Sequence, residues 1–241
     1  NRTEEIDERA EVPYLRPTNA IAVLVADIHL SAKPPVARSN ETDWMETQAG
    51  YLRQLAQLAG QLPILCAGDI FDKWNSPPEV INLALTHMPL MYAVPGQHDL
   101  PNHNWHDLKR SAYWTLVATG RITNLVPNAP IGVNALRLHG FPFGFDVTSC
   151  DKPHDMATEI AVVHQFVWSK NKGTGYTGAS EEQTVGKYQK KLRGYTVAVF
   201  GDNHTSFKST QEDTGFVNCG AFIRRRAVEM LHKPSVALLY R

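Results

Sequence analysis

The 241-residue chain contains only three cysteines, and they lie far apart at Cys66, Cys150 and Cys219. An odd number of cysteines without a CxxC pair indicates neither a disulfide framework nor a cysteine zinc site. The sequence also lacks an excess of charge of either sign, since Lys plus Arg and Asp plus Glu number 24 each. No general electrostatic field would therefore draw the protein to nucleic acid or to an anionic membrane. Any polyanion must bind at a local site.

Long hydrophobic runs are absent as well. The longest apolar stretches, such as residues 21–26 and 160–163, have the length of a strand and fall short of the roughly 18 residues that a membrane span requires. We therefore expect a soluble protein with no membrane partner, and the cytoplasm is the default location. The chain opens on a polar, acidic stretch rather than on a charged-then-apolar signal, although the missing initiator Met leaves open that a segment was removed.

The composition is that of an ordinary globular protein. Hydrophobic residues make up 43% of the chain and charged residues 20%, which argues against disorder, collagen-like repeats and coiled coil. At this length a single large domain is the first expectation. We predict one domain over residues 1–241, with a polar N-terminal extension over residues 1–19.

Six short runs are apolar throughout, as strands buried on both faces are. They are residues 21–26, 64–67, 90–94, 160–163, 195–200 and 236–240. Between the first two runs, apolar residues from Met45 to Ala59 recur at three- and four-residue spacing, and Pro77-Pro78 opens a second helical pattern that reaches Met88. Strands and helices that alternate in this way predict βαβ crossovers and a largely parallel sheet.

Two other segments, residues 133–141 and 216–219, look like shorter strands with one buried face, and we expect them in a second sheet. A core of two sheets flanked by helices fits both patterns, so we predict an α/β fold. Residues 101–110 are polar and residues 169–186 are rich in Gly, Ser and Thr. We expect both segments to be loops.

Five of the apolar runs end in residues that can bind a metal ion. These endings are Asp27-Ile28-His29, Gly68-Asp69, Gly96-Gln97-His98-Asp99, His164 and Gly201-Asp202-Asn203-His204. Because parallel strands lie about 4.8 Å apart and their carboxyl ends share one edge of a sheet, the five endings should converge. Carboxylates and imidazoles gathered there would repel one another or stay unsatisfied without a cation, and a mixed nitrogen and oxygen set suits a divalent metal.

Each ending has a simpler explanation when it is taken alone. Asp27-x-His29 could be a loop or a helix cap, Gly68-Asp69 and residues 201–204 could be ordinary turns, and His164 could be a core histidine. These separate explanations do not account for every central strand finishing in Asp, His or Gln. One dinuclear metal centre accounts for all of them.

The order of these motifs resembles that of the calcineurin-like metallophosphoesterases, which is Asp-x-His, Gly-Asp-x-x-Asp, Gly-Asn-His-Asp, a lone His, and Gly-His-x-His. The second motif reads Gly68-Asp69-Ile70-Phe71-Asp72 here, the match spans residues 21–204, and every motif falls in order. The resemblance implies a four-layer α/β/β/α sandwich of two mixed sheets flanked by helices, with two divalent metal ions.

Carried over position by position, the resemblance implies seven metal ligands. Asp27, His29 and His204 would hold the first metal, Asp69 would bridge, and Gln97, His164 and Asp202 would hold the second. His98 would be a catalytic residue that faces the scissile phosphate, and Asp99 would orient its imidazole. Asp72 would support the ligands without binding the metal itself.

Two positions depart from the family's motifs. Gln97 stands where the family has Asn, and Asp202 stands where it has the first His of Gly-His-x-His. Both would contact the second metal, where an aspartate replaces a neutral nitrogen with an anionic oxygen. Two divalent ions and three carboxylates would leave one positive charge instead of the usual two. We therefore expect Mn²⁺, or Mg²⁺, rather than zinc or iron at this position.

A pair of divalent ions suits in-line attack of water on a phosphate ester, so the leading interpretation is a metal-dependent phosphoesterase. The Gly-Asp-Ile-Phe-Asp and Gly-x-His-Asp-Leu-Pro segments most resemble the SbcD-type DNA repair nucleases and their phage relatives. This resemblance implies an exonuclease or endonuclease that cuts DNA phosphodiesters with manganese. Such nucleases usually act beside an ATPase, but the DNA-binding cap and ATPase-binding segment of the larger members are missing here, which argues against an ATPase partner.

Two alternatives stay open. One is a phosphatase or a small-molecule phosphodiesterase, because this kind of site serves several substrates. The other is a non-catalytic scaffold that has lost its second metal. Basic residues at 187–193 and 224–226, and Trp105 with its neighbouring histidines, could track a nucleic-acid backbone and stack a base, or could be ordinary surface. The oligomeric state is not indicated.

Overall fold

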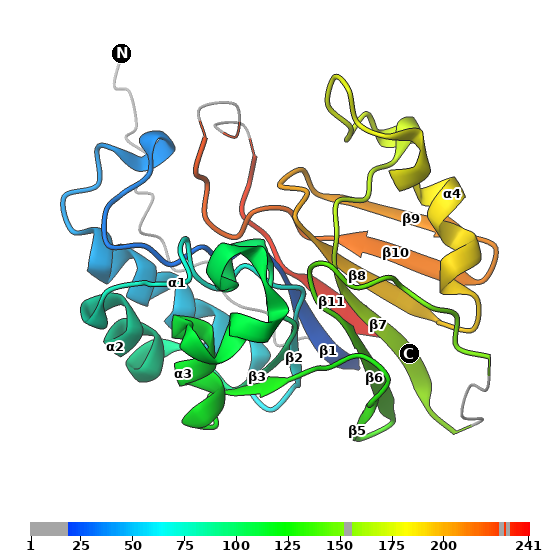
Figure 1. The fold of residues 1–241 in the computed structure, drawn as a ribbon, viewed down its shortest axis with the longest axis horizontal. Helices are drawn as coiled ribbons and strands as arrows, with labels where there is room; N and C mark the ends of the chain where they lie inside the picture. The colour runs from blue at the N-terminus through cyan, green and yellow to red at the C-terminus, as the bar shows by residue number, and fades with distance from the viewer. Residues whose placement is uncertain (1–18, 152–155, 227–228, 230–231) are drawn as a thin grey trace, which may run out of the picture.

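Two mixed sheets form the centre of the fold. The computed structural model describes residues 19–151, 156–226, 229 and 232–241. Within these residues, the first sheet has the strand order β11-β1-β2-β3-β4 and the second has the order β5-β6-β7-β8-β10-β9 (Figure 1). The polar extension expected at residues 1–19 lies outside the described residues except for Asn19.

The first sheet has four parallel strands and one antiparallel edge strand. The parallel strands are β1 (Ala20–Val25), β2 (Ile64–Cys66), β3 (Met91–Ala93) and β4 (Ile122–Asn124), and β11 (Ala237–Tyr240) pairs antiparallel to β1. Four of these strands coincide with predicted apolar runs. β4 is not among the predicted strands, because of its three residues only Ile122 is buried.

The second sheet also has four parallel strands, but it has an antiparallel strand at each of its two edges. Its strands are β5 (Ile131–Val133), β6 (Leu136–Phe141), β7 (Thr158–His164), β8 (Val197–Gly201), β10 (Thr214–Asn218) and β9 (Phe207–Gln211). Strands β6, β7, β8 and β10 run parallel, whereas β5 and β9 run antiparallel to their neighbours. The prediction that all five metal-binding endings follow strands of one sheet is therefore wrong. β1, β2 and β3 belong to the first sheet, and β7 and β8 belong to the second.

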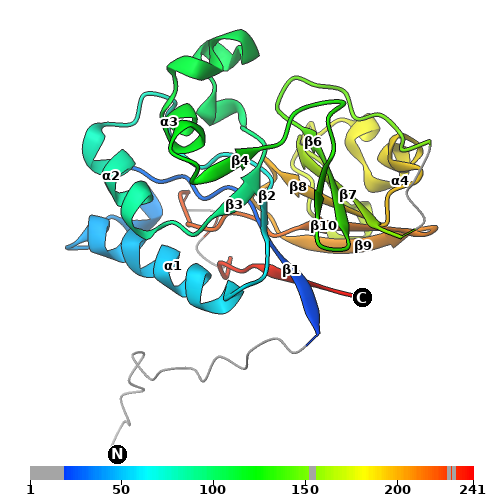
Figure 2. The ribbon, with the colours of Figure 1, turned by 90° about the horizontal axis from the view of Figure 1, so that it is seen from below.

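Helices cover the outer face of each sheet (Figures 1 and 2). On the first sheet these are α1 (Trp44–Ala59), α2 (Pro78–His87) and α3 (Ala112–Ala118), and on the second sheet α4 (Val185–Tyr188) is continued by a 3₁₀ turn over Gln189–Leu192. α1 begins after Asp43, whose carboxylate accepts a hydrogen bond from the Glu46 amide at 3.0 Å. The two predicted loops contain short 3₁₀ turns, at Pro101–His103 and Trp105–Arg110 in one, and at Lys170–Lys172 and Glu181–Gln183 in the other.

Successive residues of the central strands face different hydrophobic layers. In β1, Val23 packs against the helices and Leu24 packs between the two sheets. In β7, Val162 packs between the sheets and Val163 packs on the side of α4. Both faces of these strands are therefore covered, which explains why their sequences are apolar without alternation. The arrangement is the four-layer α/β/β/α sandwich that the motifs imply.

The described part of the chain contains no helix that is long and apolar enough to cross a membrane. Cys66, Cys150 and Cys219 are buried. Burial raises the pKa of the Cys66 thiol well above its usual range and that of Cys219 to about 12, so both remain neutral and unreactive.

Candidate metal centre

The carboxyl ends of five strands from the two sheets meet at one place. Beyond β1 and β2, the chain stays paired, because the Asp27 amide donates to the Gly68 carbonyl at 3.0 Å and the His29 amide donates to the Asp69 carbonyl at 2.9 Å. In the second sheet, the last residue of β7 and the last of β8 are register partners. All seven predicted metal ligands lie on the segments that end or follow these strands, and the structure brings them together.

The ligands predicted for the first metal form one compact group. One ligand atom from each of Asp27, His29 and His204 lies within 4.8 Å of the other two. The Nε2 atoms of His29 and His204 are 3.2 Å apart. Asp69 adjoins this group, with its Oδ2 3.6 Å from Nε2 of His29.

The ligands predicted for the second metal contact one another on the other side of Asp69. Nε2 of His164 lies 3.6 Å from Oδ2 of Asp69 and 2.5 Å from Oε1 of Gln97. The side-chain amide of Gln97 also donates to Oδ1 of Asp202 at 2.7 Å. The same Asp69 oxygen therefore faces both groups, which is the position expected of a bridging ligand.

Four of these ligands have a left-handed backbone. The φ angle is 52° at Asp27, 51° at His29, 52° at Asp69 and 75° at Asp202. Each such residue costs about 1–2 kcal/mol relative to an ordinary conformation. Gly68 is required beside them, because its φ is 96° and a Cβ atom there would lie 2.3 Å from Nδ1 of His164. The local strain turns the chain sharply after each strand, so that the side chains point at one another.

Two buried carboxylate oxygens at the centre lack a hydrogen-bond donor among the described residues. They are Oδ2 of Asp27 and Oδ2 of Asp69. Burial, together with the neighbouring charge of Asp69, raises the pKa of Asp27 well above its usual range. Burial also raises the pKa of Asp69 to about 7. A bound cation would satisfy both oxygens and remove this penalty, so the donor set fits a divalent metal.

The contact between His164 and Gln97 brings two hydrogen-bond acceptors together, which also favours a bound cation. Nδ1 of His164 lies 2.5 Å from the Ala67 carbonyl, which can only accept, so Nδ1 carries the proton. Burial lowers the pKa of His164, so the ring is neutral and Nε2 has a lone pair. That lone pair faces the Gln97 carbonyl oxygen, another acceptor. Reversing the Gln97 amide would only place its oxygen against the Asp202 carboxylate instead.

Glu229 belongs to no predicted motif, but it holds His204, one of the ligands predicted for the first metal. Nδ1 of His204 donates to Oε1 of Glu229 at 2.8 Å, which directs the lone pair of Nε2 toward the site. The other oxygen of Glu229 accepts from the backbone amides of Arg225 at 2.6 Å and Arg226 at 3.2 Å. Burial acts to raise the pKa of Glu229, but the bonds from His204 and the two amides lower it to about 2. Glu229 is therefore an anion that joins a ligand to the arginine segment.

Arg225 brings a positive charge to the edge of the site. Its guanidinium is ion-paired with the Asp72 carboxylate, and its Nη1 lies 3.2 Å from Nδ1 of His29. Asp72 thus supports the site through Arg225. The run of Arg224, Arg225 and Arg226 is visible in the sequence, but its distance from the motifs gives no sign that Arg225 contacts His29, a predicted ligand.

His98 faces the cleft, but Asp99 does not orient it. Nδ1 of His98 donates to the backbone carbonyl of Asp72 at 2.7 Å, so Nε2 is the nitrogen left for a substrate. The prediction that Asp99 orients the imidazole is wrong. Its buried carboxylate instead accepts from three backbone amides, those of Ile70 at 3.2 Å, Phe71 at 3.0 Å and Gly96 at 3.0 Å. Asp99 therefore ties the loop after β2 to the loop after β3.

An open cleft of about 820 Å³ lies over the ligands. Residues from both predicted metal groups line it, among them Gln97, Asp202 and His204. His98 and Arg225 also line it. A substrate in this cleft would meet the predicted ligands, the free nitrogen of His98 and a guanidinium together.

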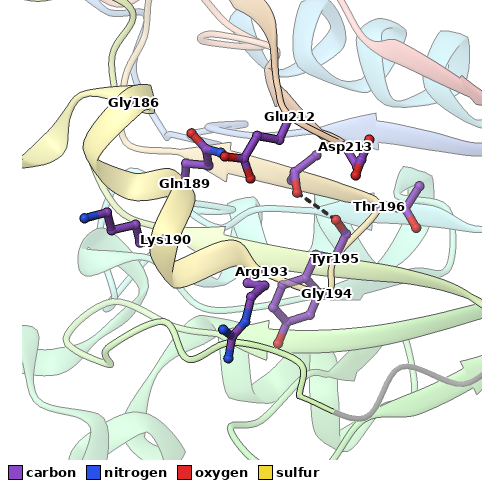
Figure 3. A pocket seen from close by; sticks show the side chains of 10 residues that line it. Gly186, Gln189, Lys190, Arg193, Gly194, Tyr195, Thr196, Glu212 and Asp213 are labelled. Atoms are coloured by element: carbon purple, nitrogen blue, oxygen red, sulfur yellow. Dashed lines mark hydrogen bonds between the residues drawn. The ribbon is translucent and has the colours of Figure 1, made fainter.

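The basic residues at 187–193 lie elsewhere. Lys190 and Arg193 line a separate pocket of about 610 Å³, together with Glu212 and Asp213 (Figure 3). This pocket lies at the start of β8, whereas the metal-binding residues follow the end of that strand, about 16 Å away at 3.3 Å per residue. This cluster therefore lies outside the cleft that the predicted metal ligands line, and its contact with a nucleic-acid backbone stays a prediction.

Comparison with known proteins identifies the family. The sequence model of the calcineurin-like phosphoesterases matches residues 22–206, which is most of the chain. The protein belongs to the calcineurin-like phosphoesterase family, and it is a hydrolase of phosphoester bonds whose ligand clusters fit divalent metal ions. No functionally curated protein gives a significant sequence match.

The chain is similar to solved structures at low sequence identity. A phosphopantetheinyl hydrolase from Mycobacterium tuberculosis is 13% identical with a TM-score of 0.48, over 92% of this chain and 96% of that one. A putative 5'-nucleotidase from Staphylococcus aureus is 10% identical with a TM-score of 0.51, over 83% of this chain and 48% of that one. This chain thus spans about half the length of that nucleotidase. At such identities the likeness concerns the fold alone.

Metal binding should stabilise the protein, and more strongly at higher pH. The metal-free pKa of Asp69 is about 7 and that of Asp27 is raised, so protons compete with the metal as the pH falls. At about 100 times its dissociation constant, Mn²⁺ should add about 2.7 kcal/mol of stability and raise Tm by roughly 5–10 °C at pH 8. Differential scanning calorimetry should show a smaller increase at pH 6 for the same Mn²⁺ concentration. An equal increase in the Asp69→Asn variant would contradict the site.

Removal of the Glu229 charge should weaken the first metal position. In Glu229→Gln, one side-chain oxygen becomes an NH₂ group that cannot accept from His204 or from the arginine amides. Loss of such a supporting contact typically costs 10–100-fold in metal affinity. Isothermal titration with Mn²⁺ measures the effect, and Glu212→Gln, at an exposed position in the pocket of Figure 3, is the matched control. Equal affinities in the two variants would refute the role given to Glu229.

Proposed function

We propose that the protein hydrolyses phosphodiester bonds in nucleic acid, with DNA as the leading substrate. The observation that carries this proposal is the pair of unpartnered carboxylate oxygens of Asp27 and Asp69 beneath an open cleft that His98 and Arg225 also line. Such an arrangement supports a divalent metal centre, a proton-transfer group and a guanidinium that act on one bound substrate.

The seven predicted ligands would hold two divalent ions, Mn²⁺ by preference and Mg²⁺ as the alternative. Asp27, His29 and His204 serve the first ion, Asp69 serves both, and Gln97, His164 and Asp202 serve the second. When bound, such ions neutralise charge on the phosphoryl oxygens and lower the pKa of the attacking water. The oxygen-rich second group, with a carboxylate and an amide, favours Mn²⁺ or Mg²⁺ over softer metals.

In this proposal, His98 donates a proton to the leaving group. Its Nδ1 donates to the Asp72 carbonyl, so the doubly protonated imidazolium of His98 can give its Nε2 proton to the leaving oxygen and become the neutral ring. The short 3₁₀ turn at Gln97–Asp99 carries the side chain, and the His98 amide donates to Oδ1 of Asp69 at 2.9 Å. The predicted bridging ligand and the proton donor are therefore joined by one hydrogen bond.

The charge of the site supports a diester over a monoester. Two divalent ions carry four positive charges and the carboxylates of Asp27, Asp69 and Asp202 carry three negative ones, which leaves one. A phosphodiester has a single negative charge, whereas a monoester near neutral pH carries about 1.5–2. Arg225 does not change this balance, because Asp72 pairs with it.

Support for DNA comes from the motif order and from the arginines at the cleft. The Gly-Asp-Ile-Phe-Asp and Gly-x-His-Asp-Leu-Pro segments resemble those of SbcD-type nucleases. Arg225 and Arg226 line the cleft beside the predicted first metal position, where they can contact phosphates on either side of the scissile bond.

An activity panel tests the proposed reaction. Mn²⁺, Mg²⁺, Zn²⁺ and Ca²⁺ should each be supplied with linear DNA, circular single-stranded DNA, a simple phosphodiester and a phosphomonoester. We expect Mn²⁺ to give the highest rates and both DNA and the simple diester to exceed the monoester. A monoester hydrolysed faster than either diester would favour a phosphatase instead, and no hydrolysis with any metal would favour a binding scaffold.

Replacement of His98 should separate catalysis from metal binding. His98→Ala should lower kcat by about 10²–10⁴-fold, the usual contribution of a positioned proton-transfer group. The Mn²⁺ content should stay unchanged, because His98 is not one of the seven predicted ligands. His106→Ala, at an exposed histidine in the Trp105–Arg110 turn, is the control and should keep the full rate. Turnover that survives His98→Ala would remove this residue from the mechanism.

A further inference from the structure

A pair of aromatic rings, one exposed and one half-buried, lines the cleft together with Gln97 and Asp202, two of the ligands predicted for the second metal. Tyr176 is 63% exposed, although it is a large ring. Its ring packs edge to face on that of Phe166, with centroids 5.0 Å apart and planes at 73°. Both residues line the same cleft as Gln97 and His98. The predicted reaction uses neither ring, so their place in the cleft calls for another role.

The backbone next to the predicted ligands holds this pair in place. Phe166 lies two residues beyond His164 in the chain. Asn203, which lies between two other predicted ligands, is 2% exposed and donates to the carbonyls of Val167 at 2.9 Å and Thr174 at 3.2 Å. Asn203 thereby joins the segment that carries Asp202 and His204 to two points, Val167 and Thr174, that lie near the two rings in the chain.

The loop between the two rings is built to keep Tyr176 in the cleft. Gly175 lies against the indole of Trp168, and a Cβ atom there would be 2.5 Å from the ring. The Trp168 indole nitrogen donates to the Ser180 carbonyl at 3.0 Å, across the base of the loop. The Tyr176 carbonyl accepts from the Ala179 amide at 3.0 Å. These contacts order the backbone on both sides of Tyr176 while its ring stays open to solvent.

We propose that Phe166 and Tyr176 form a base-binding subsite that stacks the nucleobase of a nucleotide substrate. This inference rests on the proposed function and names the substrate as a nucleoside phosphodiester. With the phosphate at the predicted ligands, the base would lie at the aromatic pair, because Phe166 follows the predicted ligand His164 by two residues and both rings line the same cleft as Gln97. A flat ring offers stacking to any base, so the subsite recognises nucleotides without selecting a sequence.

The same cleft also carries basic side chains. Arg225 and Arg226 line it together with His204, and they would contact phosphate oxygens rather than a base. Trp105, which follows the His98 motif in the sequence, packs instead against Phe145 with ring centroids 5.1 Å apart. The cleft therefore carries both basic and aromatic side chains together with the predicted metal ligands.

The experiment compares two ligands that differ only in the base. Thymidine 5'-monophosphate and 2-deoxyribose 5-phosphate are titrated calorimetrically into the Mn²⁺-loaded His98→Ala protein, in which turnover is suppressed. Thymidine 5'-monophosphate should bind roughly tenfold more tightly, within the range that base–aromatic stacking supplies. Adding Tyr176→Ala should abolish this preference and leave the affinity for deoxyribose phosphate within about twofold.

Two further variants serve as controls. Tyr176→Phe keeps the ring and should keep the preference for the thymidine ligand. Tyr240→Ala removes an exposed ring from β11 and should change neither affinity. Equal binding of both ligands before any change at Tyr176, or an equal loss for both in Tyr176→Ala, would overturn the subsite. Because binding is measured, this result is independent of the activity panel, which alone decides whether the proposed reaction occurs.

Discussion

Two carboxylate oxygens that are buried without a donor are the constraint on which the rest of the structure depends. A buried carboxylate oxygen without a partner costs several kcal/mol, and the left-handed backbone at Asp27 and Asp69 adds to that cost. A chain that holds both oxygens a few ångströms from neutral imidazoles has an arrangement that only a cation makes favourable. The tautomer of His164 also favours a cation. Its Nδ1 proton is donated to the Ala67 carbonyl, which leaves the lone pair of Nε2 facing the other predicted ligands. The sandwich around the site supplies the stability that tolerates this strain.

Much of the site could be predicted because its members are local features of the sequence. Each predicted ligand follows an apolar run directly, as Asp27 and His164 do, or within a few residues, and the carboxyl end of a strand can be recognised without knowing its neighbours. The partition into two sheets could not be obtained in this way. An apolar run shows that both faces of a strand are covered, but β2 and β7 look alike in this respect, and only pairing shows that they belong to different sheets.

The contacts that sequence reasoning missed join residues far apart in the chain. Glu229 follows His204 by 25 residues and Asp99 follows Phe71 by 28, and neither spacing is characteristic of a motif. Asp99 is also mispredicted, because its position directly after His98 suggests a role that the structure does not show. Its place after His98 favours an orienting carboxylate, but a buried carboxylate is best satisfied by several amides, and three backbone N–H groups from two loops meet it. The exposure of Tyr176 has the same origin, because it depends on how Asn203 fastens a loop that looks unstructured in the sequence.

The two departures from the family's motifs form one interaction. An aspartate at position 202 adds a negative charge to a site that already has two carboxylates, and the side-chain amide of Gln97 donates to that new carboxylate at 2.7 Å. The same amide presents its oxygen to His164, so a single side chain spans the second metal position from one ligand to the other. The extra methylene of glutamine provides this reach, whereas the shorter asparagine has less. We therefore interpret the long amide and the added acid as a matched pair that keeps a second ion in place while lowering the positive charge that a substrate meets.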